Sequence, residues 1–274
     1  MVPPTAPSVF RMKKIFLTGA SSGIGLAVAR ALSAKGYDVW GTSRKIDRVP
    51  RLPGMHPLTL DLADRDSLGQ IFRNALHEAG QFDVVINNAG SGYFGPAEAL
   101  SREELAAHFQ VLFLGQVELL HLALNSMRAG TGGLIINVSS LASRLPVPFM
   151  AAYNAAKAAL AAYIMSLQLE LPDAKVRLVD LQPADIRTAF NDAVVRAQTA
   201  EPRVRKTWEA VDHNMKTAPP PDLVAKRVLR LIEEPKTPPQ ITVGGFFQAA
   251  IAPAIFRILP QPVRLWGLRK YYGI

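Results

Sequence analysis

The sequence predicts a single α/β domain built on a doubly wound parallel sheet. Short β-rich segments alternate with helical ones, and strands are predicted at 14–18, 38–43, 57–61, 82–87, 133–138, 176–181 and 240–243. The 274 residues are 49% hydrophobic, enough for one large core, and no linker-like tract or repeat divides them. Because strands joined through helices form right-handed βαβ units, we expect ligands at the carboxyl ends of a parallel sheet.

The composition excludes several kinds of site. The chain has no cysteine, which excludes disulfides, thiolate nucleophiles and cysteine-ligated zinc, and its five histidines are too far apart to suggest a metal site. Because the chain has no cysteine, we also expect a cytoplasmic protein. The net charge of +9 favours an anionic partner, such as a phosphate-bearing cofactor or an acidic membrane surface. We expect no nucleic-acid partner, because the sequence has no nucleic-acid-binding motif.

Three segments differ from the alternating pattern. Residues 1–12 contain three prolines and no long apolar run, so a flexible leader is expected before the domain at 13–244. Residues 185–218 form a helix-prone insertion, expected to be a substrate lid. The extension at 245–274 is apolar and basic but too interrupted to span a membrane. It is expected to fold over the substrate mouth and adsorb to anionic membranes, with a capping segment or dimer contact as alternatives.

A glycine-rich turn follows the first predicted strand. Gly19, Gly23 and Gly25 lie in the sequence IFLTGASSGIG, where the next helix begins. Glycines let the backbone approach a pyrophosphate, and the first N–H groups of a helix attract anions. The spacing is G-x-x-x-G-x-G rather than G-x-G-x-x-G, so the turn alone predicts an anion site and no specific cofactor.

The same turn also matches a hydrolase motif. Residues Gly19 to Gly23 fit G-x-S-x-G, and Asp185 and His213 follow in the order of a Ser-Asp-His triad. The structural context of that motif is missing, because the turn follows the first strand and no earlier strand supplies an oxyanion loop. A hydrolase is therefore kept only as the rival prediction and is not favoured.

Three side chains suggest proton-transfer chemistry. Tyr153 and Lys157 stand one helical turn apart, so they share a helix face. A phenol has a pKa near ~10, and a cation one turn away lowers it by favouring the phenolate. Ser139 and Ser140 end a buried strand, where a hydroxyl can donate to a substrate oxygen. Along the chain the glycine turn comes first, the strand-end serines next and the Tyr–Lys pair last. This combination indicates one catalytic site.

The combined motifs resemble those of the short-chain dehydrogenase/reductase family, whose fold is of the Rossmann type. The resemblance covers about residues 13–243 and rests on the segments TGASSGIG (18–25), NNAG (87–90), Ser140, YNAAK (153–157) and QPADIRT (182–188). It implies an oxidoreductase that moves a hydride between a nicotinamide and a carbonyl or alcohol carbon. A homo-oligomer, either a dimer or a tetramer, is expected as well.

By this resemblance, Ser140 polarises the substrate oxygen, Tyr153 transfers the proton, and Lys157 holds the nicotinamide ribose and lowers the pKa of Tyr153. The cofactor is expected to lie along Gly19, Ser21, Ser22, Gly23, Ile24, Gly25, Arg44, Asp61, Leu62, Asn88, Ala89, Gly90, Tyr153, Lys157, Pro183, Ile186 and Thr188. No metal ligand is expected.

Two positions depart from the family pattern. Leu112 stands where the family has an Asn that takes part in a proton relay, and Ala184 replaces the Gly of the Pro-Gly motif. They favour the main alternative, a non-catalytic NADP(H)-binding sensor or partner-binding protein on the same fold. The intact Ser140, Tyr153 and Lys157 favour an active enzyme.

The segment after the second strand selects between the two nicotinamide dinucleotides. NAD requires a carboxylate there for its ribose 2′-hydroxyl, whereas NADP requires a basic residue for its 2′-phosphate. The chain has Ser43, Arg44 and Lys45, so NADP(H) is predicted. The candidate pocket residues are mostly apolar and predict a hydrophobic ketone, aldehyde or alcohol, of a steroid-, retinoid- or lipid-like kind; they are Tyr93, Phe94, Leu141, Leu145, Val147, Phe149, Phe190 and Trp208.

Overall fold

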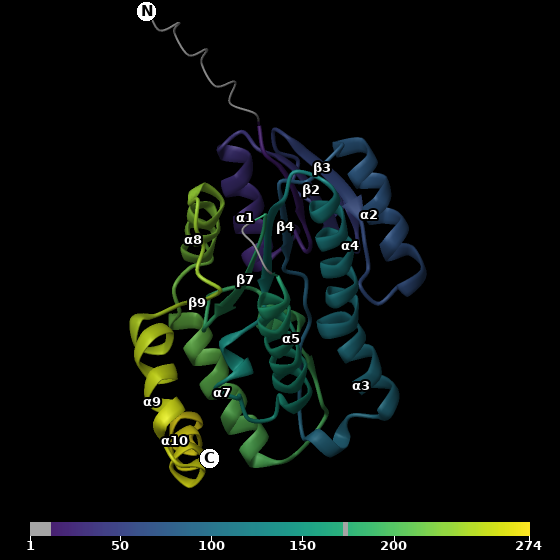
Figure 1. The fold of residues 1–274 in the computed structure, drawn as a ribbon. Coiled ribbons are helices and arrows are strands. Elements are labelled where there is room, and N and C mark those ends of the chain that lie inside the picture. Colours follow the sequence, from purple (N-terminus) through teal and green to yellow (C-terminus); the bar gives the residue numbers. More distant parts are fainter. Residues whose placement is uncertain (1–11, 172–174) are drawn as a thin grey trace, which may run out of the picture.

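The computed structural model describes residues 12–171 and 175–274 and has a doubly wound parallel sheet (Figure 1). Seven strands pair in the order β3-β2-β1-β4-β6-β7-β9. They are β1 (Lys14–Leu17), β2 (Asp38–Ser43), β3 (Met55–Thr59), β4 (Val84–Asn87), β6 (Gly133–Val138), β7 (Val176–Pro183) and β9 (Gln240–Val243). The predicted fold class is confirmed. Except for Met12, the leader predicted at 1–12 lies outside the described residues.

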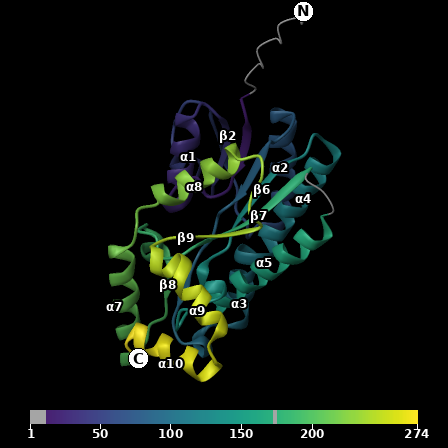
Figure 2. The ribbon, with the colours of Figure 1, turned by 60° about the vertical axis from the view of Figure 1, so that its left-hand side comes forward.

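Helices cover both faces of the sheet (Figures 1 and 2). One face carries α1 (Gly23–Ala34) and α8 (Asp222–Glu233), and the other carries α2 (Arg65–Ala79), α4 (Gly115–Ala129) and α5 (Ala151–Glu170). The strand order reverses between β1 and β4, which are direct neighbours. In open α/β sheets a crevice forms outside the carboxyl ends of the strands at such a point.

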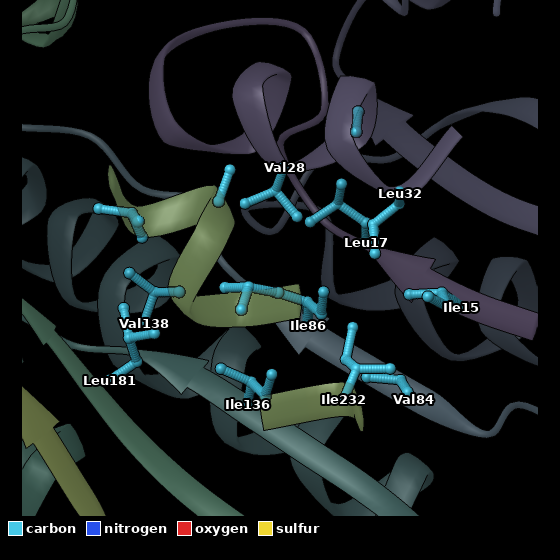
Figure 3. Close-up of a cluster of buried hydrophobic side chains, with 14 of the residues drawn as sticks. Ile15, Leu17, Val28, Leu32, Val84, Ile86, Ile136, Val138, Leu181 and Ile232 are labelled. Carbon is cyan, nitrogen blue, oxygen red and sulfur yellow. The ribbon is translucent and has the colours of Figure 1, made fainter. Parts of the chain in front are cut away.

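Branched aliphatic side chains hold the layers together. Figure 3 shows Leu17 of β1 and Ile86 of β4 packed against Val28 of α1 and Ile232 of α8, all at most 1% exposed. Burying a side chain of this kind contributes about 1.5–3 kcal/mol. The strands are short, buried on both faces and rich in Val, Ile and Leu, as parallel strands are. This packing fixes the carboxyl ends of β1, β4, β6 and β7 relative to one another.

The helix before β6 has a local irregularity. Between α3 (Arg102–Phe109) and α4, residues Gln110–Leu114 form one π-helical turn, closed by a hydrogen bond from the Gly115 N–H to the Gln110 carbonyl. The whole stretch Arg102–Ala129 is apolar and long enough to cross a membrane by length and composition. Because Leu119 and Leu120 are fully buried in the core beside the sheet, it serves here as a core helix.

The predicted lid region is built from two short elements and one longer helix. After β7 come α6 (Phe190–Ala193), β8 (Val195–Arg196) and α7 (Pro202–Thr217). Strand β8 pairs in parallel with β5 (Tyr93–Phe94), which the sequence analysis did not predict. This pairing attaches the lid region to the loop that follows β4.

The C-terminal extension is helical. A π-helical turn (Phe247–Ile251) is followed by α9 (Ala252–Ile258) and, after Pro260, by α10 (Gln261–Tyr272). In Figures 1 and 2 these yellow helices lie beside α7, at the end of the molecule far from α2. Gly273, with φ +73°, ends α10 in a left-handed conformation.

Candidate active site

The turn between β1 and α1 forms an anion cradle. Gly19 and Gly23 have φ angles of +72° and +52°, which disfavour residues with a Cβ atom. A Cβ on Gly25 would collide with the Gly19 carbonyl and lie 2.6 Å from Asn88 Nδ2. No side chain caps the N-terminus of α1, and no acidic residue stands in its first turn. The first N–H groups of α1 are therefore available to a phosphate.

Thr18 and Asn88 connect this cradle to the end of β4. Thr18 Oγ1 accepts hydrogen bonds from the N–H groups of Asn88 (2.8 Å) and Ala89 (2.9 Å). The Asn88 side chain donates to the Thr18 carbonyl at 2.9 Å, and Gln116 of α4 donates to the Ala89 carbonyl at 2.8 Å. The NNAG segment is thus held rigidly along the crevice.

A cleft of about 390 Å³ runs from the cradle to α5. Most of the predicted cofactor residues line it: Gly19, Ser21, Ser22, Gly23, Ile24, Gly25, Arg44, Asp61, Leu62, Asn88, Ala89, Gly90, Tyr153, Lys157 and Thr188. Pro183 and Ile186 line a neighbouring cavity instead, and Ile186 is buried in the core. An anion cradle at one end and a Tyr–Lys pair at the other fit a nicotinamide dinucleotide.

The loop after β2 brings positive charge to the cleft. Arg44, Lys45 and Arg48 line it, whereas Asp47 of the same loop does not. The backbone N–H of Lys45 donates to Ser43 Oγ at 3.2 Å. This part of the cleft therefore suits a phosphate better than a ribose hydroxyl.

Lys157 is held by the strand end beneath it. It is 3% exposed, and its Nζ donates to the Val138 carbonyl at 2.8 Å. Burial lowers the pKa of Lys157 to about 8, and the charge of Asp180 opposes that shift. Asp180 lies 2% exposed on β7 and accepts hydrogen bonds from Ser139 and from Gln182 (2.6 Å). The sequence analysis missed Asp180, whose signal was a lone acid within an apolar strand.

Tyr153 at the start of α5 and Ser140 after β6 line the same cavity. Burial raises the pKa of Tyr153 above its usual value, and a hydrogen bond with Ser140 opposes the rise. The resemblance implied that Lys157 lowers the pKa of Tyr153, and this expectation is corrected. The pKa is raised instead, because desolvation of the phenolate dominates. The two strand-end serines differ: Ser139 is bound to Asp180, and Ser140 is left beside the phenol.

A second cavity, also of about 390 Å³, opens on Ser140 and Tyr153. Its wall combines the loop after β7, α7 and both helices of the C-terminal extension, and it is mainly apolar. The lining includes Leu141, Leu145, Val147, Phe190, Val211, Met215, Phe247, Phe256, Leu259 and Leu268. A substrate bound here would have its reacting carbon next to Tyr153 and its apolar part against the extension.

Four of the expected pocket residues lie elsewhere. Phe94, Phe149 and Trp208 pack in a small core cluster behind the cavity wall, with the Phe94 and Trp208 rings 4.9 Å apart, and none of them lines the cavity; Tyr93 does not line it either. The sequence could not distinguish these aromatics from Phe190, which does line it. Conversely, Gln248, Asn214 and Tyr271 line the cavity and were missed, since polar residues on helices carry no pocket signal.

The rival hydrolase triad is not assembled. Ser21 lines the nucleotide cleft, Asp185 lines the apolar cavity, and His213 is exposed on α7 and lines neither. Among the described residues, no group of three His, Asp or Glu side chains could hold a metal ion.

Comparisons with known proteins agree with this geometry. Residues 13–199 match the family model described as short chain dehydrogenase. A 3-ketodihydrosphingosine reductase of Bacteroides thetaiotaomicron is 29% identical over 266 residues, 95% of this chain and 98% of the relative. A short-chain dehydrogenase structure from Streptomyces avermitilis has a TM-score of 0.78 and 25% identity, covering 96% of this chain and 95% of the other.

A second solved structure is also similar to this chain. The alcohol dehydrogenase of the archaeon Thermococcus sibiricus, complexed with 5-hydroxy-NADP, is 28% identical with a TM-score of 0.69, covering 86% of this chain and 97% of the other. The non-catalytic alternative is not favoured by the family match or by the cradle. It is not favoured either by the assembly of Ser140, Tyr153 and Lys157 in one site. The chain belongs to the short-chain dehydrogenase/reductase family and is an oxidoreductase that acts on CH–OH or C=O groups with a nicotinamide cofactor.

Proposed function

We propose that the protein is an NADP(H)-dependent oxidoreductase of long, apolar ketones, aldehydes or alcohols. The observation that carries the proposal is the apolar cavity that opens on Ser140 and Tyr153 and is closed by the C-terminal extension. The Bacteroides relative, which is named as a 3-ketodihydrosphingosine reductase, aligns over 95% of this chain. Arg44, Lys45 and Arg48 support NADP(H) as the cofactor, because the 2′-phosphate needs a cationic site.

The site residues have distinct tasks in this function. The cradle and the basic loop bind the cofactor, which supplies or accepts the hydride. Ser140 donates a hydrogen bond to the substrate oxygen, and Tyr153 gives that oxygen a proton in reduction. The raised pKa of Tyr153 keeps the phenol protonated at neutral pH, which suits reduction. Lys157 holds its charge close to the phenol and to the ribose position, with Asp180 as its counter-charge.

Steady-state oxidation of NADPH and of NADH, measured in parallel with 2-alkanones and alkanals of increasing chain length, tests the proposal. We expect NADPH to be preferred and kcat/KM to rise with chain length, because each added methylene buried in the cavity contributes about 0.8 kcal/mol. Activity that is confined to short polar carbonyls, or that prefers NADH, would contradict it.

Tyr153→Phe tests the assigned proton donor. We expect kcat to fall about 10²- to 10⁴-fold while the Kd for NADPH stays near the wild-type value, because only the phenol proton is lost. Tyr163→Phe is the matched control, since Tyr163 also lies on α5 but its hydroxyl contacts His121 outside both cavities. Full activity of Tyr153→Phe would exclude the assigned role.

A further inference from the structure

The apolar cavity contains one carboxylate, that of Asp185. The residue follows β7, and Ser140 follows β6. These strands are direct neighbours, with Val138 of β6 opposite Leu181 of β7. Because adjacent strands lie about 5 Å apart, Asp185 and Ser140 project into one cavity from adjacent loops. A group bound to Asp185 therefore lies in the same cavity as the carbon that reacts beside Ser140 and Tyr153.

A polar chain from the extension holds Asp185 in place. Gln248 Nε2 donates to Asp185 Oδ2 at 2.6 Å and to the Tyr271 hydroxyl at 2.9 Å. Asn214 of α7 in turn donates to the same hydroxyl at 3.1 Å. The lid helix α7, the extension and the loop after β7 thus meet at this carboxylate. Its second oxygen, Oδ1, receives no hydrogen bond from the described residues.

Asp185 also lacks a counter-ion within the described part of the chain. No Lys or Arg there forms an ion pair with it. Arg264 lines the same cavity, but its Nε and Nη2 donate to the carbonyls of Leu259 (2.7 Å) and Arg257 (2.9 Å). Burial raises the pKa of Asp185, against the effect of the Gln248 bond. A largely buried carboxylate without a cation is costly unless a ligand supplies one.

We propose that Asp185 binds an ammonium group that the substrate carries next to its carbonyl or carbinol carbon, which makes long-chain amino ketones and amino alcohols the preferred substrates. This inference rests on the proposed function of the cavity. The apolar wall formed by α9 and α10 takes the alkyl chain, and Asp185 distinguishes the amino compound from a plain ketone or alcohol of the same length.

The experiment compares two alcohols of matched length, because amino alcohols are chemically stable. Reduction of NADP⁺ at pH 7.5 is measured with 1-amino-2-dodecanol and with 3-tridecanol, in which a methyl group replaces the ammonium group. We expect the wild-type ratio of kcat/KM, amino alcohol over alcohol, to be at least about tenfold, as a charge-assisted hydrogen bond requires. Asp185→Asn should bring this ratio close to one. The ratio is used because a general loss of activity lowers both values of kcat/KM and leaves their ratio unchanged.

Asp192→Asn is the matched control. It removes the same charge from exposed α6, seven residues away and outside the cavity, and should keep the wild-type ratio. A wild-type ratio near one, or an unchanged ratio in Asp185→Asn, overturns the role of Asp185 and leaves the proposed function standing. If the wild type turns over neither these alcohols nor the ketones of the panel, the proposed function itself is overturned.

A second readout needs no turnover of an alcohol. With 2-tridecanone as substrate, decylamine and 1-decanol are compared as inhibitors of wild type and Asp185→Asn. A lower inhibition constant for the amine in wild type alone supports the proposal. Equal constants in wild type contradict it.

Discussion

The proposed choice of NADP(H) rests on single cationic residues at one end of the cleft. Arg44 is exposed on the loop after β2 and lines the cleft together with Lys45 and Arg48. Arg48 was not singled out from the sequence, because it is separated from the strand end by Ile46 and Asp47. An exposed guanidinium binds weakly to another side chain but strongly to a dianionic phosphate that can be bound bidentately.

Arg44→Ala should weaken NADP(H) binding and leave NAD(H) binding nearly unchanged, because only the first carries the 2′-phosphate. The loss should be about 1.5–3 kcal/mol, roughly 10- to 150-fold in Kd. Fluorescence titration with both reduced cofactors measures it, and Arg51→Ala, outside the cleft, is the control. Equal losses for both cofactors would show that Arg44 supports the fold instead.

Lys157 illustrates how a buried charge costs stability. The pKa of Lys157 is about 8 in the folded protein, against 10.5 for an unperturbed lysine. Between these values the unfolded chain binds more protons than the folded one, so the stability contribution of this residue rises with pH. It is complete above about 10.5 and is lost as the pH falls through about 8.

Lys157→Met should therefore gain stability relative to wild type at pH 7 and lose that advantage at high pH. Between pH 7 and pH 10.5 the difference in free energy of unfolding should shift by about 3 kcal/mol in favour of wild type. Urea denaturation at both pH values measures this, with Lys226→Met, an exposed lysine on α8, as control. A difference that is the same at both pH values would show that Lys157 does not titrate in this range.

At the scale of the element, the π-helical turn explains how Leu112 is accommodated. Leu112 is fully buried, and a Cβ on Gly90 would lie 3.4 Å from its Cδ2, so it packs against the NNAG segment. One turn earlier, His108 has its Nε2 buried without a hydrogen-bond partner in the described part of the chain. Burial, then the charge of Lys157, lowers the pKa of His108. A polar atom near Lys157 is thus present without an amide at position 112.

We therefore expect Leu112→Asn to change turnover by less than tenfold, a barrier difference under about 1.4 kcal/mol. Steady-state kinetics at several pH values on the best ketone of the panel measure this, and Leu112→Ala controls for lost packing. An inert wild type beside an active Leu112→Asn would mean that the relay needs the amide.

The second departure from the family pattern, Ala184, has a simpler explanation. Among the described residues, Phe149 is the one non-glycine with positive φ, so Ala184 is not in a conformation that requires glycine. Its N–H donates to the Val243 carbonyl at 2.8 Å, which continues the β7–β9 pairing. The substitution leaves the strand end intact.

On the scale of the whole molecule, exposed apolar side chains gather on the extension around the substrate cavity. Phe246 (78%), Ile258 (80%) and Trp266 (66%) are the most exposed of them. Cations lie among them on α9 and α10: Arg257, Arg264, Arg269 and Lys270. Apolar side chains interspersed with cations fit an anionic lipid surface, which is also a source of apolar substrates.

We propose that this face adsorbs to anionic membranes. Co-sedimentation with phosphatidylserine-containing vesicles should exceed that with neutral vesicles and fall with added salt. The double variant Ile258→Ser/Trp266→Ser should lose most of the binding, whereas Leu169→Ser, 85% exposed on α5, should not. Binding that is independent of the double variant would remove the claim. The homo-oligomer expected from the family resemblance stays a prediction.

The sequence by itself determined the fold class, and it singled out the glycine-rich anion cradle and the side chains that are predicted to react. Each of these has a local signal: alternating strands and helices, closely spaced glycines, and a tyrosine and a lysine one helical turn apart. Residues that belong to one turn or one helix keep their mutual geometry wherever the element packs. Predictions about Gly19, Tyr153 and Lys157 could therefore be made before the chain was folded.

Only the tertiary structure decided which groups meet across the chain. Packing of α7, α9 and α10 brings Gln248 to Asp185, 63 positions away, and Asn214 to Tyr271, 57 positions away. It also brings Ser139 into hydrogen-bond contact with Asp180 and places Phe94 and Trp208 in the small core cluster behind the cavity wall. Such contacts depend on how whole elements pack, and a buried polar contact leaves no periodic pattern in either segment. The shape and polarity of the substrate cavity were therefore set by the fold of the extension over the domain.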